Sequence, residues 1–129
     1  MAILGMNHFT VLSSDLDATL AFYCALLGLR AGARPAFDFP GAWLYSGSQA
    51  VLHVVAGRPL PADAAGVIDH VAFSASGLAD MVTLLRRRGI DHDLRRLPGG
   101  GPWQLFFHDP DGARVELDFD ATESAPPEN

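Results

Sequence analysis

The feature that most constrains the fold of this chain is an internal repeat with an offset of about 62 residues. The segment NHFTV aligns with DHVAF, which places His8 over His70, and Leu16 falls on Leu78 with the same offset. Gly28 falls on Gly89 with an offset that is one residue smaller. Because each unit of such a repeat must bury its apolar face against a partner, we expect two similar modules.

Each copy has the pattern of a strand, a helix and two further strands. In the first copy the helix can be capped by Ser13, Ser14 or Asp15, and Gly28 is a plausible end for it. In the second copy, Asp109-Pro110-Asp111-Gly112 has the residue order of a type I turn between the last two strands. We predict a single domain over residues 1–129. It consists of a first module over about 3–56, a linker over about 57–66 and a second module over about 67–120. Residues 121–129 are predicted to be a disordered tail.

A histidine stands where the repeat places a carboxylate. His53 lies in VLHVV, a run that is typical of a mostly buried strand, where an imidazole costs free energy unless its nitrogens are satisfied. His53 follows His8 by 45 residues, and Glu116 follows His70 by 46, so His53 and Glu116 occupy equivalent positions. A core histidine that is satisfied by a backbone carbonyl is the alternative interpretation.

Strand parity favours a functional role for these four residues. Side chains alternate between the two faces of a strand, so each of the four can point away from the apolar residues that pack under a helix. A two-fold-related pair of modules would then bring the four polar positions together. Three imidazoles and one carboxylate suit a divalent transition metal, with positions left for water or substrate. His92 and His108 have no symmetric partner, and we expect structural roles for them.

Composition excludes several classes of function. The chain has 129 residues, of which 49% are apolar, and this is enough for one compact domain with a sizeable core. Its formal charge of −6, from 15 acidic and 9 basic residues, argues against a nucleic-acid partner or an anionic membrane surface. No apolar run approaches the length of a membrane span, and the N-terminus lacks the basic residues of a signal peptide. Together with the single Cys24, these features predict a cytoplasmic protein.

The motifs NHFTV, DHVAF and QLFFHDPDGARVEL resemble the vicinal oxygen chelate superfamily, which includes glyoxalases, extradiol dioxygenases and bleomycin-binding proteins. The resemblance spans residues of about 5 to 119 and implies an α+β fold, in which two tandem βαβββ modules form a curled mixed sheet around a metal cleft. It implies that His8, His70 and Glu116 are metal ligands and that His53 fills the variable fourth position, as ligand or as acid–base residue. The implied cofactor is a divalent ion such as Fe²⁺, Mn²⁺, Ni²⁺ or Zn²⁺, and the implied assembly is a homodimer.

The resemblance leaves two reactions open. Glyoxalase-type isomerases match the length and module order but commonly carry a carboxylate where this chain has His53. Extradiol dioxygenases place an acid–base histidine near that position, but they usually have a tyrosine where this chain has Phe106. A metal-free binding protein of the bleomycin-resistance type is the non-enzymatic alternative. For a small and partly aromatic substrate, we expect contacts from Thr10, Trp43, Tyr45, Trp103 and Phe106, with the loop LPGGGP before Trp103 as a lid.

Overall fold

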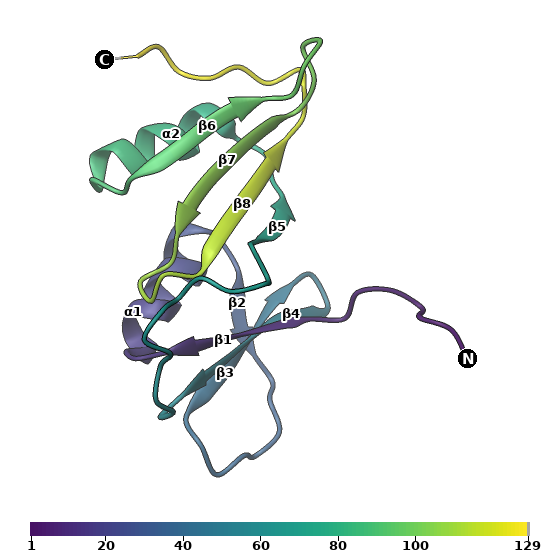
Figure 1. Ribbon diagram of the computed structural model, residues 1–129, viewed down its shortest axis with the longest axis vertical. Coiled ribbons are helices and arrows are strands. Elements are labelled where there is room, and N and C mark those ends of the chain that lie inside the picture. The colour runs from purple at the N-terminus through teal and green to yellow at the C-terminus, as the bar shows by residue number, and fades with distance from the viewer. Residues whose placement is uncertain (129) are drawn as a thin grey trace. The chain divides into compact units, whose positions relative to one another are not determined.

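The computed structural model describes residues 1–128, which form two compact units with the boundary between residues 64 and 65. Each unit contains one helical segment and one four-stranded mixed sheet, as Figure 1 shows. The first contains β1 (Phe9–Ser13), α1 (Leu16–Leu20), a π-helical segment η1 (Ala21–Leu26), β2 (Arg30–Gly32), β3 (Gly41–Ser46) and β4 (Gln49–Ala56). The second contains β5 (Val71–Ser74), α2 (Leu78–Arg87), β6 (His92–Arg96), β7 (Trp103–His108) and β8 (Arg114–Phe119).

The two sheets have the same topology. Their strand orders are β1-β4-β3-β2 and β5-β8-β7-β6, and in each the first strand runs parallel to the last while the other pairs are antiparallel. The α+β class with two repeated βαβββ modules is therefore confirmed. The predicted turn at residues 109–112 is present, since Gly112 N donates to Asp109 O at 3.1 Å.

One face of each sheet packs against the helix of its own unit. On β4 the alternating residues Leu52, Val54 and Ala56 are buried, and the residues between them are half-buried. On β8 the buried apolar residues Val115, Leu117 and Phe119 alternate in the same way. The opposite side of each sheet, which we call the far face, carries the side chains that alternate with these.

The first helix contains an irregularity that shifts its buried face. Phe22, Tyr23 and Leu26 are buried in this segment, whereas Cys24 and Leu27 are only half-buried. The cause is the π-helical segment, in which Leu27 N donates to Phe22 O at 3.1 Å, five residues back rather than four. The predicted ends of this helical segment are present, because Asp15 Oδ1 accepts from Ala18 N at 3.1 Å and Gly28 comes after the last turn with a φ of 84°.

The C-terminal residues make contacts where the sequence predicted disorder. Glu123 Oε1 accepts hydrogen bonds from Gly77 N at 3.0 Å and Leu78 N at 2.8 Å, at the start of α2. Trp103 Nε1 donates to the backbone oxygen of Glu123 at 2.9 Å, and Arg86 Nη1 donates to that of Pro127 at 2.8 Å. Asn129 lies outside the described residues.

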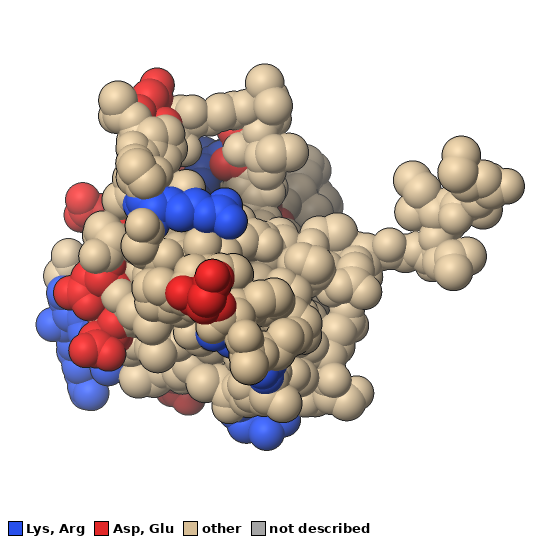
Figure 2. Space-filling model, turned by 90° about the horizontal axis from the view of Figure 1, so that it is seen from below, with Lys and Arg blue, Asp and Glu red and all other residues tan. Residues whose placement is uncertain are grey.

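Two observations bear on possible partners. Among the described residues, no helix is long and apolar enough to cross a membrane. On the face drawn in Figure 2, acidic and basic side chains are scattered among neutral ones and form no continuous basic area.

Candidate functional site

Three aromatic rings are stacked on the far face of the first sheet. His53 of β4 has Thr10 of β1 and Trp43 of β3 as its Cα partners. The ring of His8, which comes directly before β1, stacks on the ring of His53 with centroids 3.6 Å apart and an interplanar angle of 13°. Trp43 stacks on His53 from β3, with centroids 4.0 Å apart. The valine-rich strand therefore presents His53 on the far face, where its ring contacts two aromatic neighbours.

These surroundings favour the neutral form of His53. Burial lowers the pKa of His53, the positive charge of His8 lowers it further, and a hydrogen bond with the backbone of Ala50 partly opposes both effects. The physical reason is that a half-buried imidazolium is poorly solvated and would lie against a second imidazole that can also be charged. A neutral imidazole is the form that binds a metal or accepts a proton.

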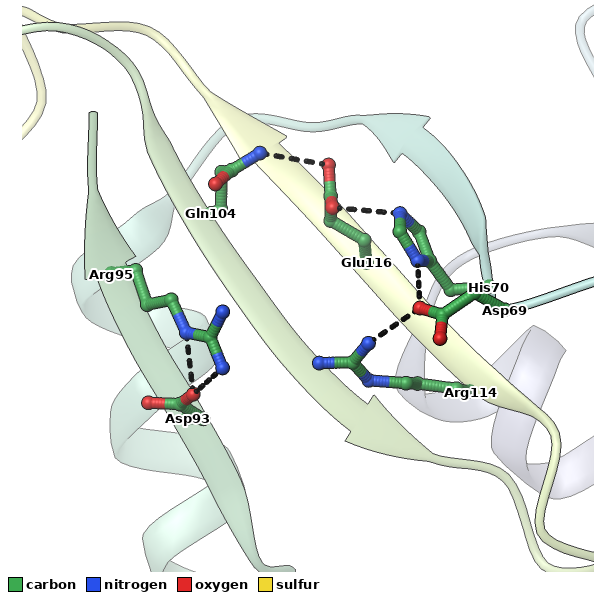
Figure 3. A network of polar contacts seen from close by, with 7 residues as sticks. All are labelled: Asp69, His70, Asp93, Arg95, Gln104, Arg114 and Glu116. Carbon is green, nitrogen blue, oxygen red and sulfur yellow. Dashed lines mark hydrogen bonds and ion pairs between the residues drawn. The ribbon is translucent and has the colours of Figure 1, made fainter. Parts of the chain in front are cut away.

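A histidine and a buried carboxylate meet on the far face of the second sheet (Figure 3). Glu116 of β8 is only 4% exposed and has Phe106 of β7 and Ala72 of β5 as Cα partners. His70, directly before β5, places its Nε2 3.1 Å from Glu116 Oε1. Gln104 Nε2 donates to the other carboxylate oxygen, Glu116 Oε2, across a long 3.5 Å.

Glu116 has a second carboxyl beside it. Burial raises the pKa of Glu116, and the hydrogen bond and negative charge of Asp118, two residues along the same strand, raise it further. His70 and Gln104 act in the opposite direction. Among the described residues, Asp118 Oδ1 is a buried oxygen without a hydrogen-bond partner. Two neighbouring carboxyls and an unsatisfied oxygen form an environment that a cation would stabilise.

Each of the two strand-leading histidines is held by the residue before it. Asp69 Oδ2 lies 2.6 Å from His70 Nδ1, and Asn7 Oδ1 lies 2.7 Å from His8 Nδ1. Arg114 Nη1 donates to Asp69 Oδ2 at 2.7 Å, so that Asp69 joins β8 to the start of β5.

The structure therefore brings the four predicted ligands together as two pairs, one in each unit. His8 and His53 form the first pair, and His70 and Glu116 form the second. Among the described residues, no group of three histidine, cysteine, aspartate or glutamate side chains is arranged to hold a metal. Each unit thus supplies two of the predicted ligands.

The predicted substrate contacts lie on both faces of their sheets. In the first unit, Thr10, Trp43 and Tyr45 lie on the far face, where the Tyr45 hydroxyl donates to Ala33 O at 2.5 Å. In the second unit, Phe106 lies on the far face, with its ring 5.5 Å from that of His70.

Trp103 differs from this expectation. Its Cα partners are Arg96 and Phe119, which place it on the helix side of the second sheet, and Arg96 lies over its ring at 4.5 Å. Trp103 and Phe106 are three positions apart on β7, so strand alternation puts their side chains on opposite faces of the sheet. Trp103 binds the C-terminal residues instead.

Sequence reasoning missed three polar residues of this site: Asn7, Asp69 and Asp118. Asp118 has the same strand parity as Glu116, and this signal was present in the sequence. Asn7 and Asp69 precede the two histidines at the same offset in the repeat, which could also have indicated a shared role. Their contacts to Nδ1 depend on backbone geometry outside the strands, because β1 and β5 begin only at Phe9 and Val71.

A sequence model of the Glyoxalase/Bleomycin resistance protein/Dioxygenase superfamily matches residues 5–117. The chain belongs to this superfamily. It is 32% identical over 120 residues to "Glyoxylase I 4" of Arabidopsis thaliana, a match that covers 88% of this chain and 69% of that protein. It is 26% identical over 119 residues to a lactoylglutathione lyase of Salmonella typhimurium, with 85% and 88% covered.

Solved structures of other proteins share the fold. One is a fosfomycin resistance protein from Listeria monocytogenes in complex with Mn(II) and a dihydroxypropylphosphonic acid. It superposes with a TM-score of 0.74 at 17% identity, over 92% of this chain and 94% of that one.

The side chains of this glyoxalase-superfamily chain suit a divalent cation. The neutral form of His53 is favoured, the facing atoms of His70 and Glu116 are both metal donors, and Asp118 carries an unsatisfied oxygen close to them. Imidazole nitrogen with carboxylate oxygen is a donor set for Fe, Mn, Ni or Zn.

Proposed function

We propose that the chain is a divalent-metal-dependent lyase or isomerase of the glyoxalase superfamily, acting on a small substrate with two neighbouring oxygen atoms. The observation that carries the proposal is the pair of histidine-containing clusters at equivalent positions of the two modules. The relatives that are named as glyoxylase and lactoylglutathione lyase support the reaction class.

In this proposal His8, His70 and Glu116 hold the cation, and His53 supplies the fourth position or carries a proton. A bound divalent cation would supply Lewis-acid polarisation of the two substrate oxygens. His53 suits proton transfer, because its surroundings favour the neutral imidazole at neutral pH. Trp43 limits the movement of His53 by stacking, so that its ring nitrogens keep one orientation.

The far-face aromatic side chains favour a substrate with an apolar or planar part. Trp43 and Phe106 lie next to the two proposed ligand pairs, one on each sheet. Aromatic side chains beside a few convergent polar groups are the usual composition of a small-molecule site. Thr10 and Tyr45 would supply hydroxyl groups on the same face as Trp43.

Extradiol ring cleavage is the second candidate reaction. The observation that favours it is His53 itself, because an imidazole at this position leaves Glu116 as the single carboxylate among the four proposed ligands. Two histidines and one carboxylate form the facial triad of non-haem Fe(II) oxygenases. Phe106, which occupies the position of the tyrosine in these enzymes, weighs against this reaction.

Metal analysis and a substrate screen test the proposal together. The protein is purified anaerobically, its bound metal is measured, and it is assayed with thiohemiacetals of 2-oxoaldehydes and with catechols under oxygen. We expect about one metal ion for each set of His8, His70 and Glu116, and we expect turnover of the thiohemiacetals. Oxygen uptake with catechols would select ring cleavage instead. A protein that binds no divalent metal after loading, yet binds aromatic ligands, would be a binding protein and not an enzyme.

The substitution His53→Gln separates the two roles of this residue. If His53 is a ligand, the weaker donor should lower metal affinity. If it carries a proton, turnover should fall while metal is retained. Retention of both metal and full activity would show that His53 is a structural residue.

A further inference from the structure

The two modules share a contact that the proposed ligand set does not include. In each, the residue directly before the strand-leading histidine places an oxygen within hydrogen-bond distance of the histidine Nδ1. The distances are 2.7 Å for Asn7 Oδ1 to His8 and 2.6 Å for Asp69 Oδ2 to His70. Asn7 and Asp69 are separated by the same offset of 62 residues as the histidines, so the contact is part of the repeat.

The chemistry of these contacts determines where the imidazole proton resides. An ionised carboxylate and an amide oxygen can only accept hydrogen bonds, so each of these contacts is a hydrogen bond only when the proton is on Nδ1. In the neutral ring, Nε2 then carries the lone pair. At His70 this nitrogen lies 3.1 Å from Glu116 Oε1 (Figure 3), so the Glu116 carboxylate competes with Asp69 for the single proton of the neutral ring. The contact of Asp69 with Nδ1 is the shorter of the two, at 2.6 Å, and this favours the proton on Nδ1.

We propose that Asn7 and Asp69 are positioning residues that hold His8 and His70 in the Nδ1–H tautomer, with Nε2 free to bind a metal. This inference rests on the proposed function where it names the metal as the ligand of Nε2. The outer carboxylates and carbonyls of histidine metal sites act in this way, by setting the tautomer and raising the basicity of the ligand.

The two positioning residues differ in how strongly they accept the hydrogen bond from the histidine. Asp69 carries a negative charge, and Arg114 Nη1 holds the same oxygen, Oδ2, at 2.7 Å. Arg114 is itself held over the ring of Phe106, 4.4 Å from its centroid. Asn7 offers a neutral amide oxygen. Because a charged acceptor forms a stronger hydrogen bond, Asp69 should fix its histidine more firmly than Asn7 does.

Nitrogen-15 NMR of the imidazoles in the metal-free protein tests the tautomers directly. The spectra are recorded at a pH of about 8.5, well above the ordinary histidine pKa of about 6.5. His92 is an internal reference for the Nδ1–H form, because its Nδ1 lies 2.9 Å from the carbonyl oxygen of Ile90. We expect His8 and His70 to show the same pattern as His92. The Nε2–H form at both in the wild-type protein would overturn the proposal.

Substitutions then identify the acceptor. Asn7→Ala and Asp69→Ala should each shift their own histidine towards the Nε2–H form and leave the other histidine unchanged. Asp69→Asn should keep the Nδ1–H form, because it reproduces the amide acceptor of the first module. Asp93→Ala is the matched control, since Asp93 is also an exposed, ion-paired aspartate of the second unit, with Arg95 as its partner at 2.7 Å. Unchanged tautomers in both alanine variants would refute the inference.

Competition with a chromophoric chelator for Zn²⁺ measures the effect on metal binding. Loss of such an outer partner typically costs about 10–100-fold in metal affinity. Because the Asp69 side chain is 72% exposed, we expect roughly 10-fold for Asp69→Ala and less for Asn7→Ala. A tautomer shift with unchanged Zn²⁺ affinity would refute the role towards metal. If the wild-type protein bound no divalent metal, the proposed function would fail, and the NMR result would decide the tautomer assignment alone.

Discussion

Glu123 should stabilise the second unit by capping a helix that has no cap of its own. The residue before α2 is Gly77, which has a φ of 88° and no side chain to accept a hydrogen bond. Glu123 Oε1 accepts from the backbone of Gly77 at 3.0 Å and of Leu78 at 2.8 Å. Its negative charge also lies at the positive end of the helix dipole.

The expected loss of stability in Glu123 variants has two contributions, the missing hydrogen-bond acceptor and the missing negative charge. Removal of an N-cap acceptor costs about 0.5–2 kcal/mol, so we expect about 1 kcal/mol for Glu123→Ala at this partly exposed position. Glu123→Gln keeps an oxygen acceptor and loses the charge, and should cost roughly 0.3–1 kcal/mol, less at high salt. For a domain of this size, 1 kcal/mol corresponds to a fall of roughly 3–6 °C in Tm.

Urea denaturation of the two variants measures the free energy of unfolding, and hydrogen exchange locates the effect. The amide of Leu78 should exchange faster in Glu123→Ala, while amides in the middle of β8 should change only with global stability. Glu128→Gln, which removes a charge from the same C-terminal segment, is the control. If Glu123→Ala matched this control within about 0.3 kcal/mol, below the lower end of the N-cap range, the capping argument would be wrong.

The site and the core support four further predictions. Glu116→Ala should lose its bound metal in elemental analysis while its circular dichroism persists, and unchanged metal content would contradict the ligand assignment. Folding lowers the pKa of His53, so its NMR titration midpoint should lie below that of the same residue in the urea-unfolded chain. The contribution of His53 to the free energy of unfolding should therefore be present above a pH of about 6.5 and be lost as the pH falls. Burial raises the pKa of the Cys24 thiol, so its alkylation by iodoacetamide should need a higher pH in the folded than in the unfolded protein, and equal profiles would refute this. We also expect a homodimer, and sedimentation at micromolar concentration that showed only a 13.8 kDa species would exclude it.

The repeat and the apolar patterns were sufficient to predict most of the fold. The residues Leu52 and Val54 alternate with His53, and this alternation identified both β4 and its far face before the structure. The pattern could not identify β2 or β6. Arg30–Gly32 is three exposed residues, and His92–Arg96 is mostly charged, so neither shows the apolar alternation from which strands are recognised. These outer strands pair through their backbones, which any residue except proline can do.

Only those residues of the candidate site that are related by the symmetry of the repeat could be predicted from the sequence. Symmetry between the modules selected His8, His53, His70 and Glu116, and the structure brings them together as two pairs. It could not indicate that Trp43 stacks on His53, because this contact depends on the register between β3 and β4. Trp103 lies on the helix side of its sheet, where it contacts Glu123, and its role as a substrate contact stays a prediction.

The π-helical segment in the first module has an evolutionary meaning. From the first helical residue to the glycine after the helix, the first module has one residue more than the second, Leu16 to Gly28 compared with Leu78 to Gly89. A π turn takes up one residue more than an α turn, so it absorbs a single-residue insertion without displacing the strands after the helix. If the modules descend from one duplicated ancestor, either an insertion in the first helix or a deletion in the second followed the duplication, and a glycine still ends each helix. Deletion of the exposed Ala25 should then restore a regular α-helix and leave β3 and β4 in register.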